Sequence, residues 1–493
     1  MDRRSGTTMT LAARFSALVV VVLYGSVIIT AQSETSDFAR IGHAGFILTT
    51  ATDYQCVGIN PANLGFVPEA QIFSLATPMM GGSERRRRDW AFTAIEGGFS
   101  AHSNALARGD IFDLMFQSSS GTFTSAQKQA AVEAFSDGGM RFNADVIAIG
   151  ASYQSQDFGG FALTVRERAT GTFILNDEAA NLIFKGRDSP YFDSLAVNWN
   201  GDSVAFATAP KYYSELFDGT VLSMLWFREF AGSYGLKILD VAGVKVYAGA
   251  TVKYFESYAY LDARVQQASF VARSALSPFF GINYGKATTP SVIPGSALAP
   301  IGTGWGLDVG ATVEFDRWTL SASIVDMGKM VFDGNVYNAG DTILNGLSST
   351  GFDSYNIFNE AQKITGDGEF FKWEGLQSAD AELPTRIKFG ASFFYSYRLQ
   401  FGIDAVASLN TTAGSMSQPV VSGGANYRAT PWLKLGIGIG GGSNMGVFVP
   451  VSILFSVFDG FWEMGLTSRD LVTYLVNKTP VVSLATGFLR FRI

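Results

Sequence analysis

Few residues in this chain could carry out acid–base, nucleophilic or metal chemistry. Its 493 residues include two histidines, His43 and His102, and a single cysteine, Cys56. His102 is followed by Ser103 and Asn104, but three consecutive residues cannot orient a nucleophile, a base and its support towards one another. The sequence has no Gly-x-Ser-x-Gly element, no His-x-x-x-His pair and no phosphate-binding loop. It therefore predicts a protein that is not an enzyme and that needs no cofactor or metal.

The composition excludes further classes of function. A formal charge of −7 and a pI near 5.1 argue against a nucleic-acid partner. A single cysteine excludes a disulfide framework and a cysteine-based metal cluster, so Cys56 is expected to be a plain buried thiol. The 54 Gly and 41 Phe, against only 14 Pro, fit long strands with one uncrowded face and one apolar face. The chemistry of this chain is therefore expected to lie in its surfaces.

The N-terminus has the pattern of an export signal. Arg3, Arg4 and Arg14 supply the positive region, residues 18–29 form an apolar region, and Ala31 ends an acceptable cleavage site. A retained anchor is the alternative, but the apolar run is shorter than the ~20 residues that a spanning helix needs. No later segment is long and apolar enough to span as a helix. We expect residues 1–31 to be a signal peptide and any membrane embedding to use strands.

Alternation with a period of two dominates the last hundred residues. In residues 385–397 one face is polar and the other apolar, apart from Phe394 on the polar face. In an exported bacterial chain this pattern is typical of a transmembrane β-barrel with its apolar face towards lipid. The apolar face carries Ile387, Phe389, Ala391, Phe393, Tyr395 and Tyr397, and the polar face carries Arg386, Lys388, Gly390, Ser392 and Ser396.

Strands counted back from the C-terminus predict an all-β, antiparallel barrel over residues 69–493, with about 14 strands or, alternatively, 16. Joints on one side are tight turns, at 459–460, 429–431, 398, 316–317, 240–243 and 156–159. Most joints on the other side are long, polar loops, which we expect to be extracellular, and 125–135 has the spacing of a short amphipathic helix. Expected strands are 70–101 (broken), 140–154, 160–168, 226–238, a ribbon from 244, 305–315, 318–327, 385–397, 399–410, 419–428, 432–441, 447–458, 461–468 and 481–493.

Aromatic residues flank the predicted turns. Trp318, Trp432 and Trp462 each come directly after a tight turn, and Tyr395 and Tyr397 precede one. Core packing could explain any single Trp, but three at matched positions favour a girdle at the membrane surface.

Some inward positions carry apolar side chains, for which an open aqueous pore has little use. Phe448, Pro450, Leu454, Phe394 and Val406 have this parity, and they could line a path for a hydrophobic ligand or pack against a plug. Pro450 also cannot donate to a strand ladder, so it is expected to leave a gap in the wall. Charged inward residues are expected to form a paired, wet lumen wall: Asp308, Glu314, Lys245, Lys253, Arg386, Lys388 and Asp404.

The four consecutive arginines Arg85 to Arg88 form the one charge run. They fit a solvated loop; alternatively, they could attract carboxylates in the lumen or contact lipopolysaccharide phosphates.

Residues 32–68 do not alternate, and a barrel of fourteen strands has a lumen too wide for side chains alone to fill. Gly42-x-x-Gly45, followed by Gly58-Ile59-Asn60-Pro61-Ala62-Asn63-Leu64, resembles the N-terminal hatch of the FadL-type family, and 138–147 resembles FadL-related barrels of the Bacteroidetes type, which include PorV-like barrels. That family consists of fourteen-stranded outer-membrane channels for hydrophobic compounds. The resemblance implies a hatch closed by Asn60, Pro61 and Ala62.

The resemblance and the barrel pattern together predict passive uptake of a hydrophobic small molecule, such as a fatty acid, through a hatch-gated channel in the bacterial outer membrane, in contact with its lipid. The Gly159-Gly160 pair, or Pro450, would open the wall sideways. Two alternatives stay open: a non-transporting barrel that docks a secretion or surface-assembly partner, and a soluble secreted all-β protein.

Overall fold

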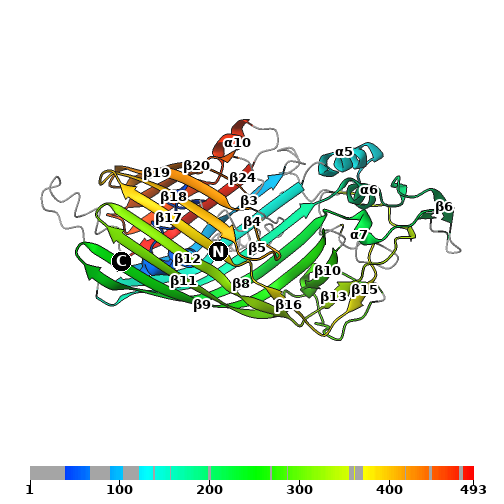
Figure 1. The fold of residues 1–493 in the computed structure, drawn as a ribbon, viewed down its shortest axis with the longest axis horizontal. Helices are drawn as coiled ribbons and strands as arrows, with labels where there is room; N and C mark the ends of the chain where they lie inside the picture. The colour runs from blue at the N-terminus through cyan, green and yellow to red at the C-terminus, as the bar shows by residue number, and fades with distance from the viewer. Residues whose placement is uncertain are drawn as a thin grey trace, which may run out of the picture.

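Strands arranged in a single closed barrel make up most of the molecule (Figure 1). Because each strand pairs with the next along the chain and the last pairs with the first, the sheet has no free edge. The computed structural model describes residues 39–66, 89–103, 122–136, 139–155, 157–197, 201, 203–266, 269–285, 287–354, 360, 370–416, 418–442, 447–476 and 481–493.

Fourteen strands form the ring, which confirms the predicted count and the antiparallel order. The first and last strands close it, with Ala91 opposite Arg492 and His102 opposite Val481. In order, the strands are β3 (Trp90–Ser103), β4 (Gly139–Ser155), β5 (Gly159–Ile174), β8 (Val221–Val241), β9 (Val244–Gln266), β11 (Gly302–Phe315), β12 (Trp318–Phe332), β17 (Arg386–Phe394), β18 (Leu399–Ser408), β19 (Val420–Thr430), β20 (Leu433–Gly442), β22 (Val451–Val457), β23 (Trp462–Ser468) and β24 (Val481–Arg492).

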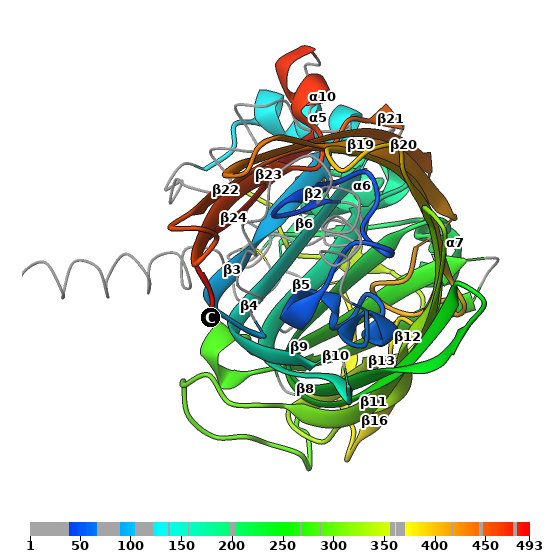
Figure 2. The same ribbon diagram turned by 90° about the vertical axis from the view of Figure 1, so that its left-hand side faces the viewer.

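Short joints gather at one end of the barrel, here called the turn end, and long ones at the other, the loop end. The six tight turns predicted from the sequence all lie at the turn end. Backbone conformation explains their residues, since Asp316, Asp459 and Gly460 have positive φ and Asp and Gly tolerate that region. Figure 2 looks into the turn end, where the strands form a ring.

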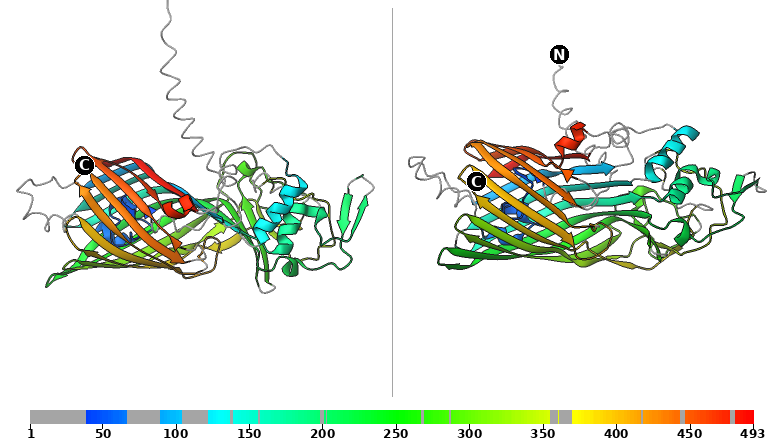
Figure 3. Two further views of the ribbon diagram at one scale, coloured as in Figure 1. Left: turned by 90° about the horizontal axis from the view of Figure 1, so that it is seen from above. Right: turned by 45° about the horizontal axis from the view of Figure 1, so that its top comes forward.

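The wall is tall on one side and short on the other. β8 and β9 have 21 and 23 residues, whereas β22 and β23 have seven each. The tall strands continue past the rim into an extension at the loop end, seen at the right of Figure 1 and in both views of Figure 3. The short strands leave the opposite wall with little height.

The two faces of the wall differ as the alternation predicted. On β17, Phe389 is 53% exposed and points outward, while Arg386 and Lys388 are buried inside. Trp318, Trp432 and Tyr395 are exposed at the turn end. The outward face is therefore the apolar surface of a membrane-spanning barrel.

A second aromatic belt marks the other edge of the apolar band. Trp305 is exposed on β11, with its ring 5.1 Å from that of Tyr254. Trp305 and Phe315 are ten residues apart on this strand. At roughly 3.3 Å per residue and a tilt of about 40°, the two belts are about 25 Å apart, the height of a membrane-spanning band.

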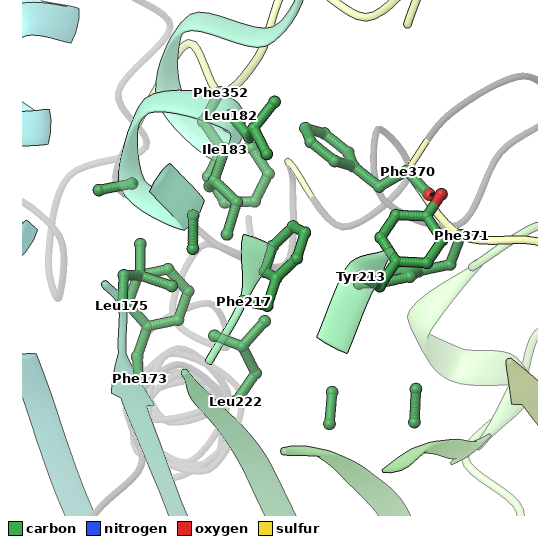
Figure 4. Close-up of a cluster of buried hydrophobic side chains, with 14 of the residues drawn as sticks. Phe173, Leu175, Leu182, Ile183, Tyr213, Phe217, Leu222, Phe352, Phe370 and Phe371 are labelled. Atoms are coloured by element: carbon green, nitrogen blue, oxygen red, sulfur yellow. Dashed lines mark hydrogen bonds between the residues drawn. The ribbon is translucent and has the colours of Figure 1, made fainter. Parts of the chain in front are cut away.

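The extension at the loop end has its own apolar core (Figure 4). Phe173 from β5 and Leu222 from β8 meet Ile183 and Phe217, which lie on or beside two short helices. The predicted helix is confirmed as α5, which buries Ala131, Val132 and Phe135 in the same core. The elements of the extension are α5 (Ser125–Ser136), α6 (Asp177–Lys185), α7 (Tyr213–Leu216), β6 (Ser194–Val197), β7 (Ser203–Phe206), β10 (Ser269–Leu276), β13 (Val336–Ala339), β14 (Gly346–Leu347), β15 (Trp373–Gly375) and β16 (Ala379–Glu382).

Tyr213 anchors α7 in this core. Its hydroxyl donates to the Phe370 carbonyl oxygen, and burial raises the pKa of Tyr213 to about 12, so the hydroxyl stays a donor at neutral pH.

Among the residues that the structure describes, no helix is long and apolar enough to cross a membrane. The predicted signal peptide at 1–31, the arginine run at 85–88 and the first part of the broken strand predicted from 70 lie outside the described residues.

A lysine on the outward face should destabilise the folded barrel in a bilayer. Ile437 lies in the middle of β20 and is 57% exposed towards the apolar band. Ile437→Lys is expected to cost about 2–4 kcal/mol of folding free energy in a bilayer. Refolding into lipid vesicles measures this change. Val292→Lys, at an exposed position in a loop of the extension, is the control; equal folding of both variants would contradict the membrane-facing assignment.

Candidate functional site

The N-terminal segment, residues 39–66, runs inside the ring of strands (Figure 2). Phe46, Ile47 and Tyr54 are completely buried although the segment has almost no regular structure. Its backbone groups must therefore find partners in the barrel wall or within the segment itself.

Asn60, Pro61 and Ala62, the predicted hatch residues, form a compact turn. Asn60 is extended, as the residue before a proline should be, and its side chain accepts from the Ala62 N–H at 3.2 Å. Its Nδ2 donates to Thr312 Oγ1 of β11 at 2.8 Å. Ala62 packs with Phe66 against Tyr247 of β9. The predicted element is thus held between two strands of the tall wall.

Side chains of the wall form hydrogen bonds with backbone groups in the middle of the segment. Asp404 of β18 accepts from the backbone N–H of Ile47 and of Leu48, at 2.5 and 2.8 Å. Lys388 of β17 donates to the Gly58 carbonyl oxygen at 3.0 Å. These contacts fix the segment to the part of the wall opposite β3 and β4.

A second group of charges holds the segment to β24. Asp53 pairs with Arg490 at 2.7 Å and with Arg492 at 3.1 Å. The Tyr54 hydroxyl donates to Glu96 of β3 at 2.6 Å. Because these strands are the first and the last of the barrel, the segment bridges the closing seam.

His43, in the N-terminal segment, lies against the short side of the wall. Burial lowers the pKa of His43 well below its usual value, and the nearby cations Lys434 and Arg490 lower it further. The ring is therefore neutral, and its Nδ1 shares a hydrogen bond with Thr50 Oγ1 at 2.9 Å.

Glycines line the wall where the segment touches it. A side chain at Gly249 would lie 2.5 Å from the Pro61 carbonyl oxygen, and one at Gly424 would lie 2.7 Å from the carbonyl oxygen of Ala44. Backbone therefore packs directly on backbone, which only glycine permits. Other wall glycines in contact with the segment are Gly150, Gly160, Gly235, Gly310, Gly390, Gly402, Gly436, Gly438, Gly465 and Gly487.

A layer of buried ions lies beside the segment, with Asp326 of β12 at its centre. Asp326 accepts from Lys253 at 2.6 Å, from Arg168 at 2.9 Å and from Arg386 at 3.0 Å. Its own N–H donates to Asp308 at 2.8 Å.

The position of Asp326 depends on a bulge. Two residues of β12, Val325 and Asp326, lie opposite Asp308 alone, and Asp326 has φ +59°. Beyond this bulge β12 changes partner from β17 to β16. The barrel wall and the loop-end extension therefore meet at this residue.

Seven consecutive strands contribute to this layer, one side chain each except for two from β5. Arg166 pairs with Asp145 at 2.5 Å, and Arg168 pairs with Glu229 at 2.8 Å. Lys253 pairs with Asp308 at 2.8 Å. The members of the ionic layer are Asp145, Arg166, Arg168, Glu229, Lys253, Asp308, Asp326 and Arg386.

The expectation of a wet lumen wall is wrong for five of the residues it named, which are at most 2% exposed: Lys253, Asp308, Arg386, Lys388 and Asp404. Lys253 and Asp308 are paired as expected, but both side chains are completely buried. Packing by the N-terminal segment and the neighbouring strands excludes water, and buried charges then require partners. Lys245 and Glu314, towards the turn end, form the more exposed pair of the predicted set, at 3.3 Å.

An apolar group, the mouth cluster, lies against the loop-end side of the ionic layer. The Phe227 ring lies 5.1 Å from the Arg168 guanidinium carbon and 5.2 Å from the Phe255 ring. Tyr260 stacks on Phe332 at 4.3 Å. The mouth cluster comprises Leu225, Phe227, Phe255, Tyr260, Ala275, Ile301, Met330, Phe332, Val336, Ala379, Leu383 and Ala413.

Two of the predicted path residues, Val406 and Phe448, come together in a smaller group, the rim cluster. They pack with Met416 and Val420 on the short side of the wall, and all four are buried. The Arg469 guanidinium carbon lies 4.5 Å from the centre of the Phe448 ring.

Leu454 and Phe394 lie elsewhere. Leu454 sits under the N-terminal segment, where it would touch any side chain placed at Gly42. Phe394 ends β17 at the turn end, and its N–H donates to the Arg317 carbonyl oxygen at 3.0 Å. The predicted path residues therefore do not form one site.

Pro450 lies at an interruption of its strand, but its carbonyl oxygen still accepts from the Gly438 N–H of β20 at 2.9 Å, so the gap in the wall stays a prediction. The strand is split into β21 (Val447–Phe448) and β22, with Val449 and Pro450 between them. Pro450 lies at the rim, since the ladder from β22 to β23 ends with Val451 opposite Ser468. Beyond that pair, the Val449 carbonyl accepts from the N–H of Leu471, at 3.3 Å.

A short apolar helix follows this break. α10 (Leu471–Val476) exposes Leu471, Val472 and Leu475, by 41%, 46% and 67%. In Figure 2 it projects from the wall at the top. The rim cluster inside, the interrupted strand and this helix outside thus lie close together.

Sequence reasoning missed Asp326 and the glycine-lined contact. Asp326 lies near the end of the strand predicted at 318–327, where alternation gives no sign of a bulge, and the glycine content alone fits strands with one uncrowded face. A signal was available in the spacing, because Gly235, Gly249 and Gly310 all lie at inward positions of predicted strands.

The described residues include no group of three or more His, Cys, Asp or Glu side chains that could hold a metal ion.

A model of a family of unknown function, DUF5723, matches residues 93–459. No curated protein matches the sequence. Among solved structures, the chain resembles the toluene transporter TodX of Pseudomonas putida, with 9% identity, TM-score 0.42 and coverage of 95% of this chain and 99% of that one. It also resembles the toluene transporter TbuX of Ralstonia pickettii, with 8% identity, TM-score 0.41 and coverage of 94% and 98%. A FadL homologue of Pseudomonas aeruginosa has 13% identity, TM-score 0.36 and coverage of 94% and 98%. At such identities and TM-scores the likeness carries no conclusion about activity.

Adding a methyl group to the glycine-lined contact should loosen the N-terminal segment. Gly249→Ala would push on the Pro61 carbonyl, whereas Gly232→Ala, on neighbouring β8, meets its nearest atom at 3.6 Å. Cys56, completely buried in the segment, reports the change as the only thiol of the chain. We expect a maleimide to label Cys56 at least about tenfold faster in Gly249→Ala than in the wild type or Gly232→Ala. Equal rates in all three would contradict a tight contact.

Proposed function

Because the chain belongs to the DUF5723 family, whose function is unknown, we propose from its own residues that it is an outer-membrane channel for the passive uptake of hydrophobic small molecules. One observation carries the proposal: an apolar-faced, membrane-spanning barrel encloses apolar clusters, while its lumen is occupied by a segment bonded to the wall on several sides. An open pore for polar solutes has no use for this arrangement.

The N-terminal segment acts as the hatch in this proposal. The domain division is then a signal peptide at 1–31, a hatch at 32–68 and a barrel at 69–493. Resemblance of Gly42, Gly45 and the Asn60-Pro61-Ala62 element to the FadL-type hatch supports this role. So do the hydrogen bonds from Asn60 to β11 and from Ile47 to β18.

The solute leaves sideways through the wall beside Pro450. It would enter from the loop end, pass the mouth cluster and reach the rim cluster around Phe448. The interrupted strand and the low wall at β22 and β23 support an opening here. α10 then offers an apolar surface for transfer into the lipid.

The direct test is to identify what the purified protein carries. The protein is extracted in mild detergent and its bound small molecules are analysed by mass spectrometry. We expect a hydrophobic compound, in a molar ratio near one or below and absent from a control barrel purified in the same way. Repeated purification with no hydrophobic compound, combined with no uptake of labelled dodecane by cells that express the protein, would refute the proposal.

Closing the break at Pro450 should slow uptake. Pro450→Val gives this position an N–H and a β-branched side chain, so the strand can continue without interruption. We expect uptake of labelled dodecane to fall at least about fivefold while the barrel still assembles. Pro431→Val, at a turn-end joint, should retain wild-type uptake; a similar rate in both variants would place the exit elsewhere.

Docking of a secretion or surface-assembly partner is the second candidate. The sheet β14–β7–β6 at the tip of the extension supports it, because Leu195 and Val197 of β6 are 61% and 67% exposed. Co-purification of one stable protein partner that is lost in Leu195→Ser would favour docking over transport.

A further inference from the structure

The ionic layer carries no net charge among the eight residues that define it. Four are acidic, Asp145, Glu229, Asp308 and Asp326, and four are basic, Arg166, Arg168, Lys253 and Arg386. We propose that this balance makes the channel selective for uncharged hydrophobic molecules over carboxylates of the same chain length. The inference rests on the proposed function, and it names the class of solute.

Each cation of the layer is already paired with at least one of its carboxylates. Arg168 pairs through Nη1 with Glu229 at 2.8 Å and through Nη2 with Asp326 at 2.9 Å. Lys253 contacts Asp308 and Asp326, at 2.8 and 2.6 Å. A carboxylate that arrives here must displace one of these partners, and the displaced group then stays buried without its cation.

Arg166 and Arg386 are equally committed. Arg166 binds Asp145 through both Nε and Nη2, at 2.9 and 2.5 Å, which is the two-point geometry that favours Arg–carboxylate pairs. Arg386 binds Asp326 at 3.0 Å. Both arginines are only 2% exposed, and the carboxylates already paired with them occupy the positions that a solute anion would need.

The side of the layer that faces the mouth cluster is apolar. Phe227 covers the Arg168 guanidinium at 5.1 Å, and Phe255 packs on Phe227. The acidic side chain at the border of the cluster, Asp262, is itself paired with Arg264 at 2.6 Å. A solute in the mouth cluster therefore meets aromatic rings and compensated charges.

An uncharged hydrophobe gains from this environment, since transfer of its apolar surface out of water is favourable. Burial of the alkyl chain is equally favourable for a carboxylate of the same length. Its charged group, however, also loses its hydration without gaining a cation as a partner. The difference between the two should appear as selectivity.

Asp326 is the residue at which one substitution changes the charge balance of the layer while the shape of the bulge is kept. Its φ of +59° is a conformation that Asn also adopts readily, so Asp326→Asn keeps the bulge and nearly the same shape. The variant leaves four cations with three carboxylates, and Arg168, Lys253 and Arg386 each lose one anionic contact. An arriving carboxylate could then take the place of the missing charge.

Binding of 1-dodecanol and of dodecanoate at pH 8 tests the inference on the full-length protein in lipid nanodiscs. We expect the wild type to bind the alcohol at least about tenfold more tightly than the acid. In Asp326→Asn the preference should shrink at least about fivefold, through tighter binding of the acid. Asp316→Asn is the matched control, because Asp316 also has positive φ, +50°, but lies in an exposed turn at the turn end. Its preference should equal that of the wild type.

Each other outcome is decisive. Equal or tighter binding of dodecanoate by the wild type would overturn the inference and leave the proposed function standing. An unchanged preference in Asp326→Asn, with Glu229→Gln as a second variant if the first does not fold, would also overturn it. If the wild type binds neither compound nor dodecane, the proposed function fails and the inference with it.

Discussion

Backbone packed on backbone is the contact on which the rest of this structure depends. A ring of fourteen strands encloses more space than its own side chains can fill, and here the N-terminal segment fills the space by lying on glycines such as Gly249 and Gly424. Because the wall has no side chains at these points, the segment approaches closely enough for wall residues such as Asp404 to bond its N–H groups. The high glycine content of the chain follows from this contact as much as from the strands themselves.

Filling the lumen creates the second constraint. Inward charges that would face water in an open barrel are buried, and the cost of their desolvation is met by pairing across seven strands. Asp326 shows how closely the pairing constrains the backbone, since its carboxylate reaches three cations from a bulge with positive φ. Removing one partner would leave an uncompensated buried charge, so the layer stabilises a single register of the tall strands.

The apolar groups are distributed around this layer. The mouth cluster covers it from the loop end, and the rim cluster lies towards the short wall near Pro450. In the proposed channel a hydrophobic solute moves between these apolar surfaces, with the ionic layer beside its path. The same separation keeps the inward charges of the barrel apart from its apolar clusters.

Much of this architecture follows from local patterns. The strands, their order and the six tight turns could be predicted because alternation and turn residues act over a few neighbours along the chain. The inward parity of Phe394, Val406 and Phe448 was also predictable, as was the interruption at Pro450, because each depends on one strand. What could not be predicted is which inward residues meet. Asp326 and Arg168 are far apart in sequence, and a bulge, whose position alternation does not reveal, brings them together.

By itself the sequence determined that this chain builds an antiparallel barrel with an apolar outer face, since period-two patterning and turn chemistry are properties of short segments. Only the tertiary structure decided how the N-terminal segment is held against the wall, that the ionic layer is buried and balanced, and that the rim cluster lies behind the broken strand. The physical reason is that burial and charge pairing depend on residues brought together by closure of the sheet.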